Sequence, residues 1–273
     1  PNSTRAMAMG DAYAMSSGHA DALFYNPSLL GRASGMGLEG QRWGSASSSF
    51  AMSGAFSFLG GGIGIGLRSL QYGALDGASA APGGQDHLFT LGDAPVSERI
   101  ATVGYAREAC WGLDLGIALD FVDERVDGLR QSVVMADIGL SGDIGPVTVG
   151  LTLADIGEKP IVDERQGPGR ILLGAGAYGR ELGIFDVGFA ARLGVDGDEL
   201  AYGGGVEVGY WPVRGRTFVA RLGFQDVPDG SEALPLTTGF AFQGDEVTVE
   251  WAYRPFGDGA PNGGTHRLAL RLR

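Results

Sequence analysis

Acidic and basic side chains that could do chemistry recur at alternate positions along this chain. Paired carboxylates perform general acid and base catalysis in glycoside hydrolases, so such acids raise the question of an enzyme. No third catalytic group or cleft signature accompanies them here. The charged residues that we place together on one face of the predicted strands are Asp114, Asp120, Asp137, Asp186, Arg192, Glu207, Arg221, Glu250, Arg267 and Arg271.

Their spacing favours ion pairs between neighbouring strands. Glu207 is expected to face Arg221, and Glu250 is expected to face Arg267 or Arg271. Two interpretations stay open for this charged face. It is either a lattice of ion pairs that braces the interior of a barrel, or the lining of a path for a solute.

The motifs of common enzyme families are missing. The chain has no Walker loop, HExxH, GxSxG or CxxC sequence, and the glycines of 60–64 fit a hairpin turn better than a phosphate loop. The histidines His19, His87 and His266 are scattered, and Cys110 is the single cysteine. We therefore predict no enzyme, no metal site and no cofactor.

The segment from Trp111 to Phe121 shows the pattern that positions these charges. Large apolar residues occupy its odd positions, and glycine, alanine or aspartate occupies its even positions. Successive side chains of a strand point to opposite faces, so the segment has one apolar face and one small or acidic face. The same pattern recurs in 147–154, 247–253 and 267–273.

The two faces suit lipid on one side and water on the other. Arginine or lysine on a lipid-facing strand costs about 2–4 kcal/mol near the bilayer midplane, so the charged face is expected to point inward. Aromatic residues near strand ends, such as Tyr210 and Trp251, fit interfacial girdles. The residues assigned to lipid include Phe50, Phe56, Ile65, Leu67, Phe185, Phe189, Phe218, Leu222, Phe224, Phe240 and Phe242.

Alternating segments and their connections define the predicted fold. Most segments have about the 9–11 residues that a tilted strand needs to cross a bilayer, and short turns alternate with longer connections. We predict an all-β, transmembrane, antiparallel up-and-down barrel of about 14 strands with a short N-terminal helical plug. The strands are expected at 34–43, 46–58, 61–73, 98–108, 111–123, 130–142, 145–155, 170–180, 183–194, 199–211, 215–226, 235–243, 246–255 and 264–273. A soluble β-sandwich is the alternative fold.

The composition and net charge limit the classes of partner that the chain can bind. The chain has 273 residues and a net charge of −12, which argues against nucleic acid as a partner. No apolar run is long enough for a membrane helix. Many of its 49 glycines lie within strand patterns, where they imply curvature or close approach of another element.

The residues before the first strand do not alternate. Arg5-Ala6-Met7-Ala8-Met9-Gly10-Asp11-Ala12 is followed by Asp21-Ala22-Leu23-Phe24-Tyr25-Asn26-Pro27-Ser28-Leu29-Leu30. These stretches resemble the N-terminus of the FadL-type outer-membrane barrels, which include fatty-acid transporters and PorV/PorQ-like proteins. The chain departs from that pattern in having Ser28-Leu29 where Ala-Gly is usual, and one residue fewer before Asn26.

The resemblance implies a plug at 1–33 inside a barrel domain at 34–273. Its ligand or plug residues would be Met7, Met9, Leu23, Phe24, Tyr25, Asn26 and Pro27. It also implies a bacterial outer-membrane location after removal of a signal peptide. The first hypothesis is a passive channel for hydrophobic or amphipathic small molecules. The alternative is a PorV-like assembly subunit that binds another outer-membrane or secreted protein, with 74–97 as a docking loop.

Overall fold

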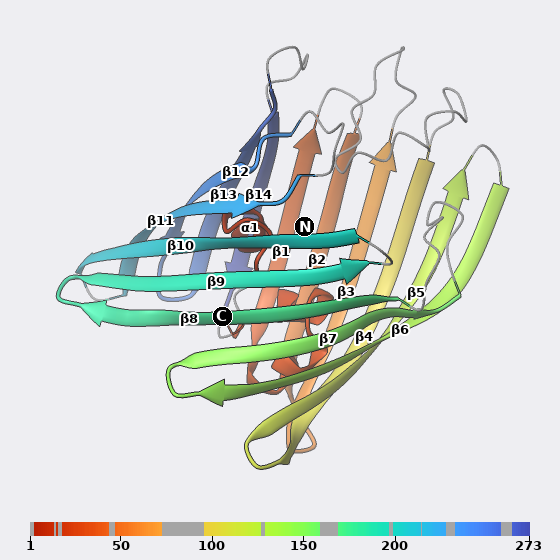
Figure 1. The fold of residues 1–273 in the computed structure, drawn as a ribbon, viewed down its shortest axis with the longest axis horizontal. Coiled ribbons are helices and arrows are strands. Elements are labelled where there is room, and N and C mark those ends of the chain that lie inside the picture. Colours follow the sequence, from red (N-terminus) through yellow and green to blue (C-terminus); the bar gives the residue numbers. More distant parts are fainter. Residues whose placement is uncertain are drawn as a thin grey trace.

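The computed structural model is a closed antiparallel barrel in which each strand pairs with its neighbours in sequence and β1 closes the ring with β14 (Figure 1). It describes residues 3–13, 15, 18–43, 47–72, 96–126, 129–158, 169–196, 199–213, 215–227, 233–257 and 264–273. Among these residues, no helix is long and apolar enough to cross a membrane. The predicted all-β, up-and-down barrel is confirmed, with strands β1–β14.

The strands lie close to where the alternation predicts them. They are β1 Gly35–Trp43, β2 Ser47–Phe58, β3 Gly61–Tyr72, β4 Val96–Cys110, β5 Leu113–Val126, β6 Leu129–Ile144, β7 Val147–Gly157, β8 Arg170–Leu182, β9 Phe185–Asp196, β10 Glu199–Val213, β11 Arg216–Gln225, β12 Leu236–Gln243, β13 Val247–Pro255 and β14 Gly264–Leu272.

The turn between β4 and β5 corrects one sequence expectation. The alternation places Trp111 at the start of a strand, but it is a turn residue with 94% exposure and a φ of 55°. Gly112 follows with a φ of 75°, so both central residues adopt the left-handed conformation that suits a tight hairpin. Because a non-glycine residue rarely adopts this φ, the alternation pattern alone misses the turn.

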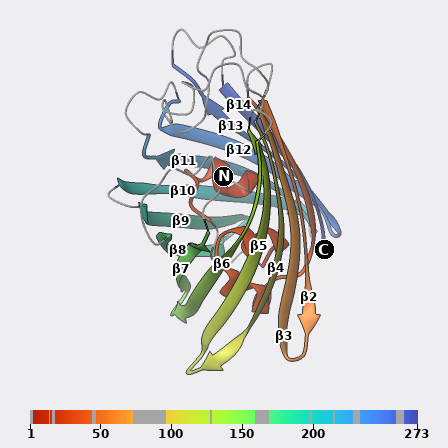
Figure 2. The same cartoon turned by 90° about the vertical axis from the view of Figure 1, so that its right-hand side faces the viewer.

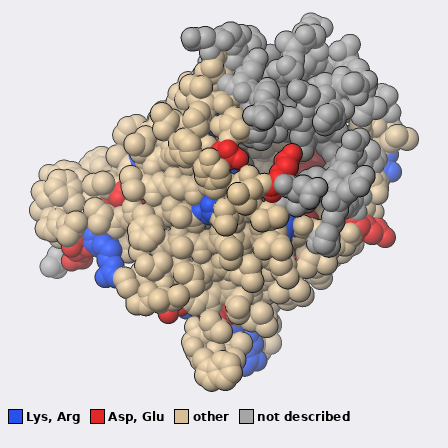
Figure 3. Space-filling view, in the orientation of Figure 1, with Lys and Arg blue, Asp and Glu red and all other residues tan. Residues whose placement is uncertain are grey.

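Strand β5 shows how the two faces separate. Leu115, Ile117 and Phe121 are exposed on the outside, whereas Asp114 and Asp120 are buried on the inside. The large residues assigned to lipid on the other strands are likewise exposed, including Phe50, Phe218, Leu222 and Phe240. Most of the described surface in Figure 3 carries no charge, as a lipid-facing wall requires.

The N-terminal segment, of which residues 3–13, 15 and 18–33 are described, lies inside this wall (Figures 1 and 2). It contains one short helix, α1 Thr4–Ala8, and two 3-10 helices, η1 Ala20–Phe24 and η2 Pro27–Arg32. Pro27 interrupts the helical residues of the segment, as a proline is expected to do: η1 ends at Phe24 and η2 begins at Pro27. The Asn26 side chain accepts a hydrogen bond from the backbone N–H of Ser28 and caps η2.

A substitution on the apolar face tests the outward orientation of the wall. Ile117→Arg is expected to lower the free energy of unfolding in lipid vesicles by about 2–4 kcal/mol, because it places a guanidinium near the bilayer midplane. The matched control is Ser132→Arg, beyond the apolar residues of β6, which is expected to cost about 0–1 kcal/mol. Denaturant titration of both variants measures the difference, and equal costs would contradict the assignment.

Candidate functional site

The candidate site is the space inside the barrel where the N-terminal segment meets the wall. The segment carries its apolar side chains into contact with small wall residues. Leu23 and Leu30 are fully buried in a cluster with Ala55, Ala106 and Ala118. Phe24 packs against the same cluster, and the Arg68 guanidinium lies 5.0 Å from the centre of its ring.

Glycines on β5 and β6 allow the backbone of the segment to touch the wall. A Cβ atom on Gly116 would collide with the backbone of Pro27 and Ser28, and one on Gly139 would collide with the Asn26 side chain. Larger residues at these two wall positions would displace η2 from the wall. Glycine weakens a strand, but at these positions it allows the N-terminal segment to approach the wall closely.

Asn26 joins the segment to two strands. Its Nδ2 donates hydrogen bonds to the carbonyl oxygens of Leu140 on β6 at 3.2 Å and Leu151 on β7 at 3.4 Å. The hydroxyl groups of Ser28 and Ser141 lie 2.7 Å apart. Tyr25 stacks on Tyr13 with ring centroids 4.5 Å apart.

Met7 and Met9 are buried, at 1% and 0% exposure, and contact other strands of the wall. Met7 packs with Ala8 and Ala252, and Met9 packs with Ala12 and Ala190. All the predicted plug residues thus lie against the inside of the wall. Whether they bind a ligand stays a prediction.

A chain of alternating arginines and carboxylates connects the segment to β1, β10, β11, β13 and β14. We call it the lumen ion network, and it comprises Arg5, Asp21, Glu39, Glu207, Arg221, Glu250, Arg267 and Arg271. Within it, Glu207 pairs with Arg221 at 2.9 Å and Glu250 pairs with Arg271 at 2.6 Å, while Arg267 pairs with Glu39. Glu39 is not among the charges that the sequence pattern selects.

Arg271 is the branch point of the network. Its Nη2 atom lies 2.8 Å from Asp21 of the segment and 3.0 Å from Glu39 of β1, and its Nε atom donates to Glu250 of β13. All these side chains are at most 4% exposed. Removal of one partner would leave the others charged in a site with little water.

The other predicted lumen charges lie outside this network. Asp114 pairs with Arg32 at 2.8 Å, Asp120 pairs with Arg68 at 3.1 Å, and Arg192 pairs with Asp11. Asp137 accepts a hydrogen bond from the backbone N–H of Asp155. Asp186 is partly buried near the turn between β8 and β9.

Three of these acids lie near one another. Ligand oxygens of Asp120, Asp137 and Asp155 come within 4.8 Å of one another among the described residues. Arg68 and Arg170 neutralise part of this charge by pairing with Asp120 and Asp155. This cluster could hold a cation, but its arginine partners explain it equally well, so the absence of a metal site stays a prediction.

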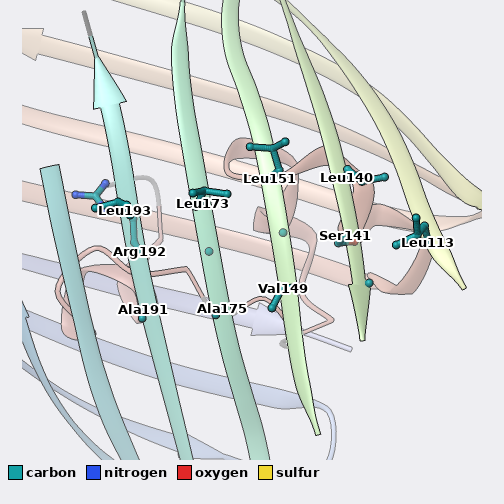
Figure 4. Close-up of a pocket in the computed structure, with 13 residues that line it drawn as sticks. Leu113, Leu140, Ser141, Val149, Leu151, Leu173, Ala175, Ala191, Arg192 and Leu193 are labelled. Carbon is teal, nitrogen blue, oxygen red and sulfur yellow. The ribbon is translucent and has the colours of Figure 1, made fainter. Parts of the chain in front are cut away.

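An apolar pocket of about 460 Å³ lies in the wall across β5–β9 (Figure 4). The outward residues Leu140, Leu151, Leu173 and Leu193 pair across neighbouring strands and form one row of its lining. The next row holds smaller residues, including Ala175 and Ala191, which leave the hollow.

Glycines separate this pocket from the N-terminal segment. Gly150 and Gly174 pair across β7 and β8, and both line the pocket. On their inner side, a Cβ atom at either position would come too close to the Met15 side chain. Only one layer of backbone lies between the pocket and Met15 there.

The ladder between β7 and β8 ends before strand β8 does. β7 pairs with β8 only as far as Gly176, whereas β8 continues to pair with β9 to Leu182. Among the described residues, the end of β8 from Arg180 to Leu182 therefore has ladder partners on β9 alone. No sequence signal marks this interruption, because it depends on the relative lengths of two hairpins.

The comparisons with known proteins agree on the fold. No family model and no curated protein matches the chain. The P. putida toluene transporter TodX superposes with a TM-score of 0.58 at 12% identity, covering 98% of this chain and 95% of that one. A Pseudomonas aeruginosa FadL homologue gives a TM-score of 0.59 at 8% identity, covering 99% and 98%. The fold is that of the FadL-type barrels.

The predicted resemblance is therefore confirmed at the level of the fold, and it supports placement in the bacterial outer membrane. The helical plug is confirmed only as one short helix and 3-10 turns. The well-matched structures are those of channels, a transporter and a FadL homologue, and none gives support to the PorV-like alternative. Removal of a signal peptide and the absence of enzyme activity stay predictions.

Arg271→Gln tests the lumen ion network. The substitution leaves the Asp21, Glu39 and Glu250 carboxylates buried without their shared cation, so the free energy of unfolding is expected to fall by about 3–5 kcal/mol. Arg180→Gln is the control, because Arg180 is exposed near the turn of β8. Denaturant titration in detergent compares the two, and a similar small cost for both would show that the network contributes nothing.

The environment of His19 predicts that the stability of the fold depends on pH. Burial, together with the nearby Arg271 guanidinium, lowers its pKa to about 4. The unfolded chain binds a proton near pH 6.5 and the folded chain does not, so stability falls as pH drops from 6.5 towards 4, by about 2–3 kcal/mol. Arg271 and Arg192 hold the pKa values of Asp21 and Asp11 below their usual range despite burial. Protonation of these two acids therefore lowers the stability of the fold only at a lower pH.

The measurement is the free energy of unfolding between pH 7 and about pH 4.5. His19→Gln is expected to remove the decline, whereas His266→Gln, an exposed position on β14, is expected to leave it unchanged. A decline of the same size in His19→Gln would assign the pH dependence to other groups.

Proposed function

We propose that this chain is a passive outer-membrane channel for hydrophobic or amphipathic small molecules. The observation that carries the proposal is the apolar wall pocket across β5–β9, which lies directly outside Met15 of the N-terminal segment. An apolar solute needs a route on which it meets few charges. The pocket lining is predominantly leucine, valine, alanine and glycine.

The division into a plug at 1–33 and a barrel at 34–273 is part of this proposal. The segment occupies the lumen and is held by buried ion pairs, so it restricts a direct path for water and ions. In contrast, the wall at Gly150 and Gly174 is a single layer of backbone, so a lateral path between the segment and the lipid would need only a local opening of this layer. A laterally directed solute would leave the barrel through the pocket.

The comparisons favour the same class of solute. One similar structure is that of a toluene transporter, and others are those of monoaromatic hydrocarbon channels. Toluene is therefore a suitable first probe. The lumen charges would then brace the barrel rather than line a solute path, since most of them form ion pairs with other charged residues.

A substitution that fills the pocket tests the proposal. Ala175→Trp places an indole between Val149 and Ala191 in the pocket, so uptake of radiolabelled toluene by cells that express the barrel is expected to fall severalfold. Leu222→Trp on β11 is the matched control, because it adds an indole to the lipid face elsewhere on the barrel. Equal amounts of each variant in the outer membrane are verified first.

Two outcomes would contradict the proposal. Toluene uptake no greater than that of cells without the barrel would exclude a channel for this solute class. Equal uptake by both tryptophan variants would exclude the pocket as its route. Affinity purification from native membranes checks the alternative, because a stoichiometric protein partner would favour an assembly subunit; the proposed docking loop, 74–97, falls largely in 73–95, which lies outside the described residues.

A further inference from the structure

Three arginines form a cationic rim on the outer face of β4, β5 and β6, directly beyond the apolar band. The rim comprises Arg99, Arg125 and Arg130, and all three side chains are exposed. This local excess of positive charge stands out in a chain whose net charge is −12. It indicates an anionic partner on the outside of the barrel.

The register shows where the rim lies relative to lipid. The last apolar row is Ala101, Phe121 and Val134, which pair across the three strands. The next outward row is Arg99, Asp123 and Ser132, and the one beyond it is Ser97, Arg125 and Arg130. The change from apolar to charged therefore occurs at one level on all three strands.

The positive charge of the rim is neutralised only in part by its neighbours. Arg125 lies directly opposite Arg130 in the β5–β6 ladder, and like charges at this position destabilise a sheet. Asp123 is the only acid in the two rows, and its carboxylate already receives both hydrogen bonds from Arg130, at 2.7 and 3.2 Å. Arg99 and Arg125 form no hydrogen bond or ion pair with another described residue.

The outer row remains polar and free of acids beyond these strands. It continues through Gln71 on β3 and Ser48 on β2. These residues supply amide and hydroxyl donors, and the rim itself supplies guanidinium donors. A phosphate group accepts hydrogen bonds from all three, and arginine binds it in a bidentate manner.

We propose that this rim binds the phosphorylated headgroup of an anionic lipid in the surrounding leaflet. The rim faces away from the lumen at the level where the apolar band ends, so lipid headgroups are the molecules that meet it. The rim lies at the end of β5 that precedes the connection at 127–128, opposite the tight turn at Trp111-Gly112. The inference rests on the outer-membrane placement but not on the identity of the transported solute.

Lipid A, a diphosphorylated glycolipid, is the probe, and phosphatidylethanolamine is the zwitterionic comparison. The purified full chain in detergent is titrated with each lipid, and bound lipid is counted by native mass spectrometry. The test variant is Arg99→Gln/Arg125→Gln/Arg130→Gln. The control is Arg107→Gln, which removes an exposed outward arginine from the opposite end of β4.

Wild type and Arg107→Gln are expected to prefer lipid A, and the triple variant is expected to bind it at least about tenfold more weakly. Equal binding by the triple variant and wild type would overturn the inference, as would equal binding of both lipids by wild type. Binding of inorganic phosphate without preference for lipid A would also overturn it. Heat-modified mobility on gels verifies that the triple variant is folded.

The result of the lipid-binding experiment does not depend on the result of the toluene-uptake experiment. Loss of lipid A binding in the triple variant supports the rim even if toluene uptake is absent, because the rim acts on the outside of the barrel. Normal toluene uptake with unchanged lipid A binding would leave the channel proposal intact and remove only the rim.

Discussion

The buried ion network around Arg271 is the interaction on which the rest of the structure depends. β14 supplies Arg271, β1 supplies Glu39, and these strands form the seam that closes the barrel. Asp21 brings the N-terminal segment to the same guanidinium. Closure of the wall and seating of the segment therefore share one set of charges. Because these charges are almost fully buried, each is favourable only when all its partners are present.

Small residues on the inside of the wall are a second requirement of the structure, because the ion network can form only if the N-terminal segment comes close to the strands. The segment can bring Asp21 and Arg5 to the network only if its backbone approaches the strands closely. Glycine at 116 and 139 permits this approach on one side, and alanine at 190 and 252 permits it on the other. A barrel of the same size lined by large side chains would have no room for the segment.

The sequence is informative about the wall because lipid imposes a period of two on every strand, which constrains the register strongly. This period predicted the pair Glu207–Arg221, since both residues point inward on adjacent strands. It fails at Trp111, which continues the alternation yet lies in a turn, because a left-handed backbone is invisible to the pattern. Glu39 was missed because its partners on β14 meet it only when the barrel closes. The pocket likewise depends on outward leucines that line up across several hairpins.

The strand pairing is regular at the seam that the network closes and contains register shifts around the pocket. Between β13, β14 and β1 the pairing runs without a register shift, and the charges there are buried and paired. Across β6–β9 the ladders contain shifts at Ala136/Ile138 and Ala177/Arg180, and β7 pairs with β8 over a short stretch. Fewer ladder bonds make a wall easier to deform locally. The ion network thus joins the strands at the seam, whereas the pocket lies across β5–β9 on the other part of the ring.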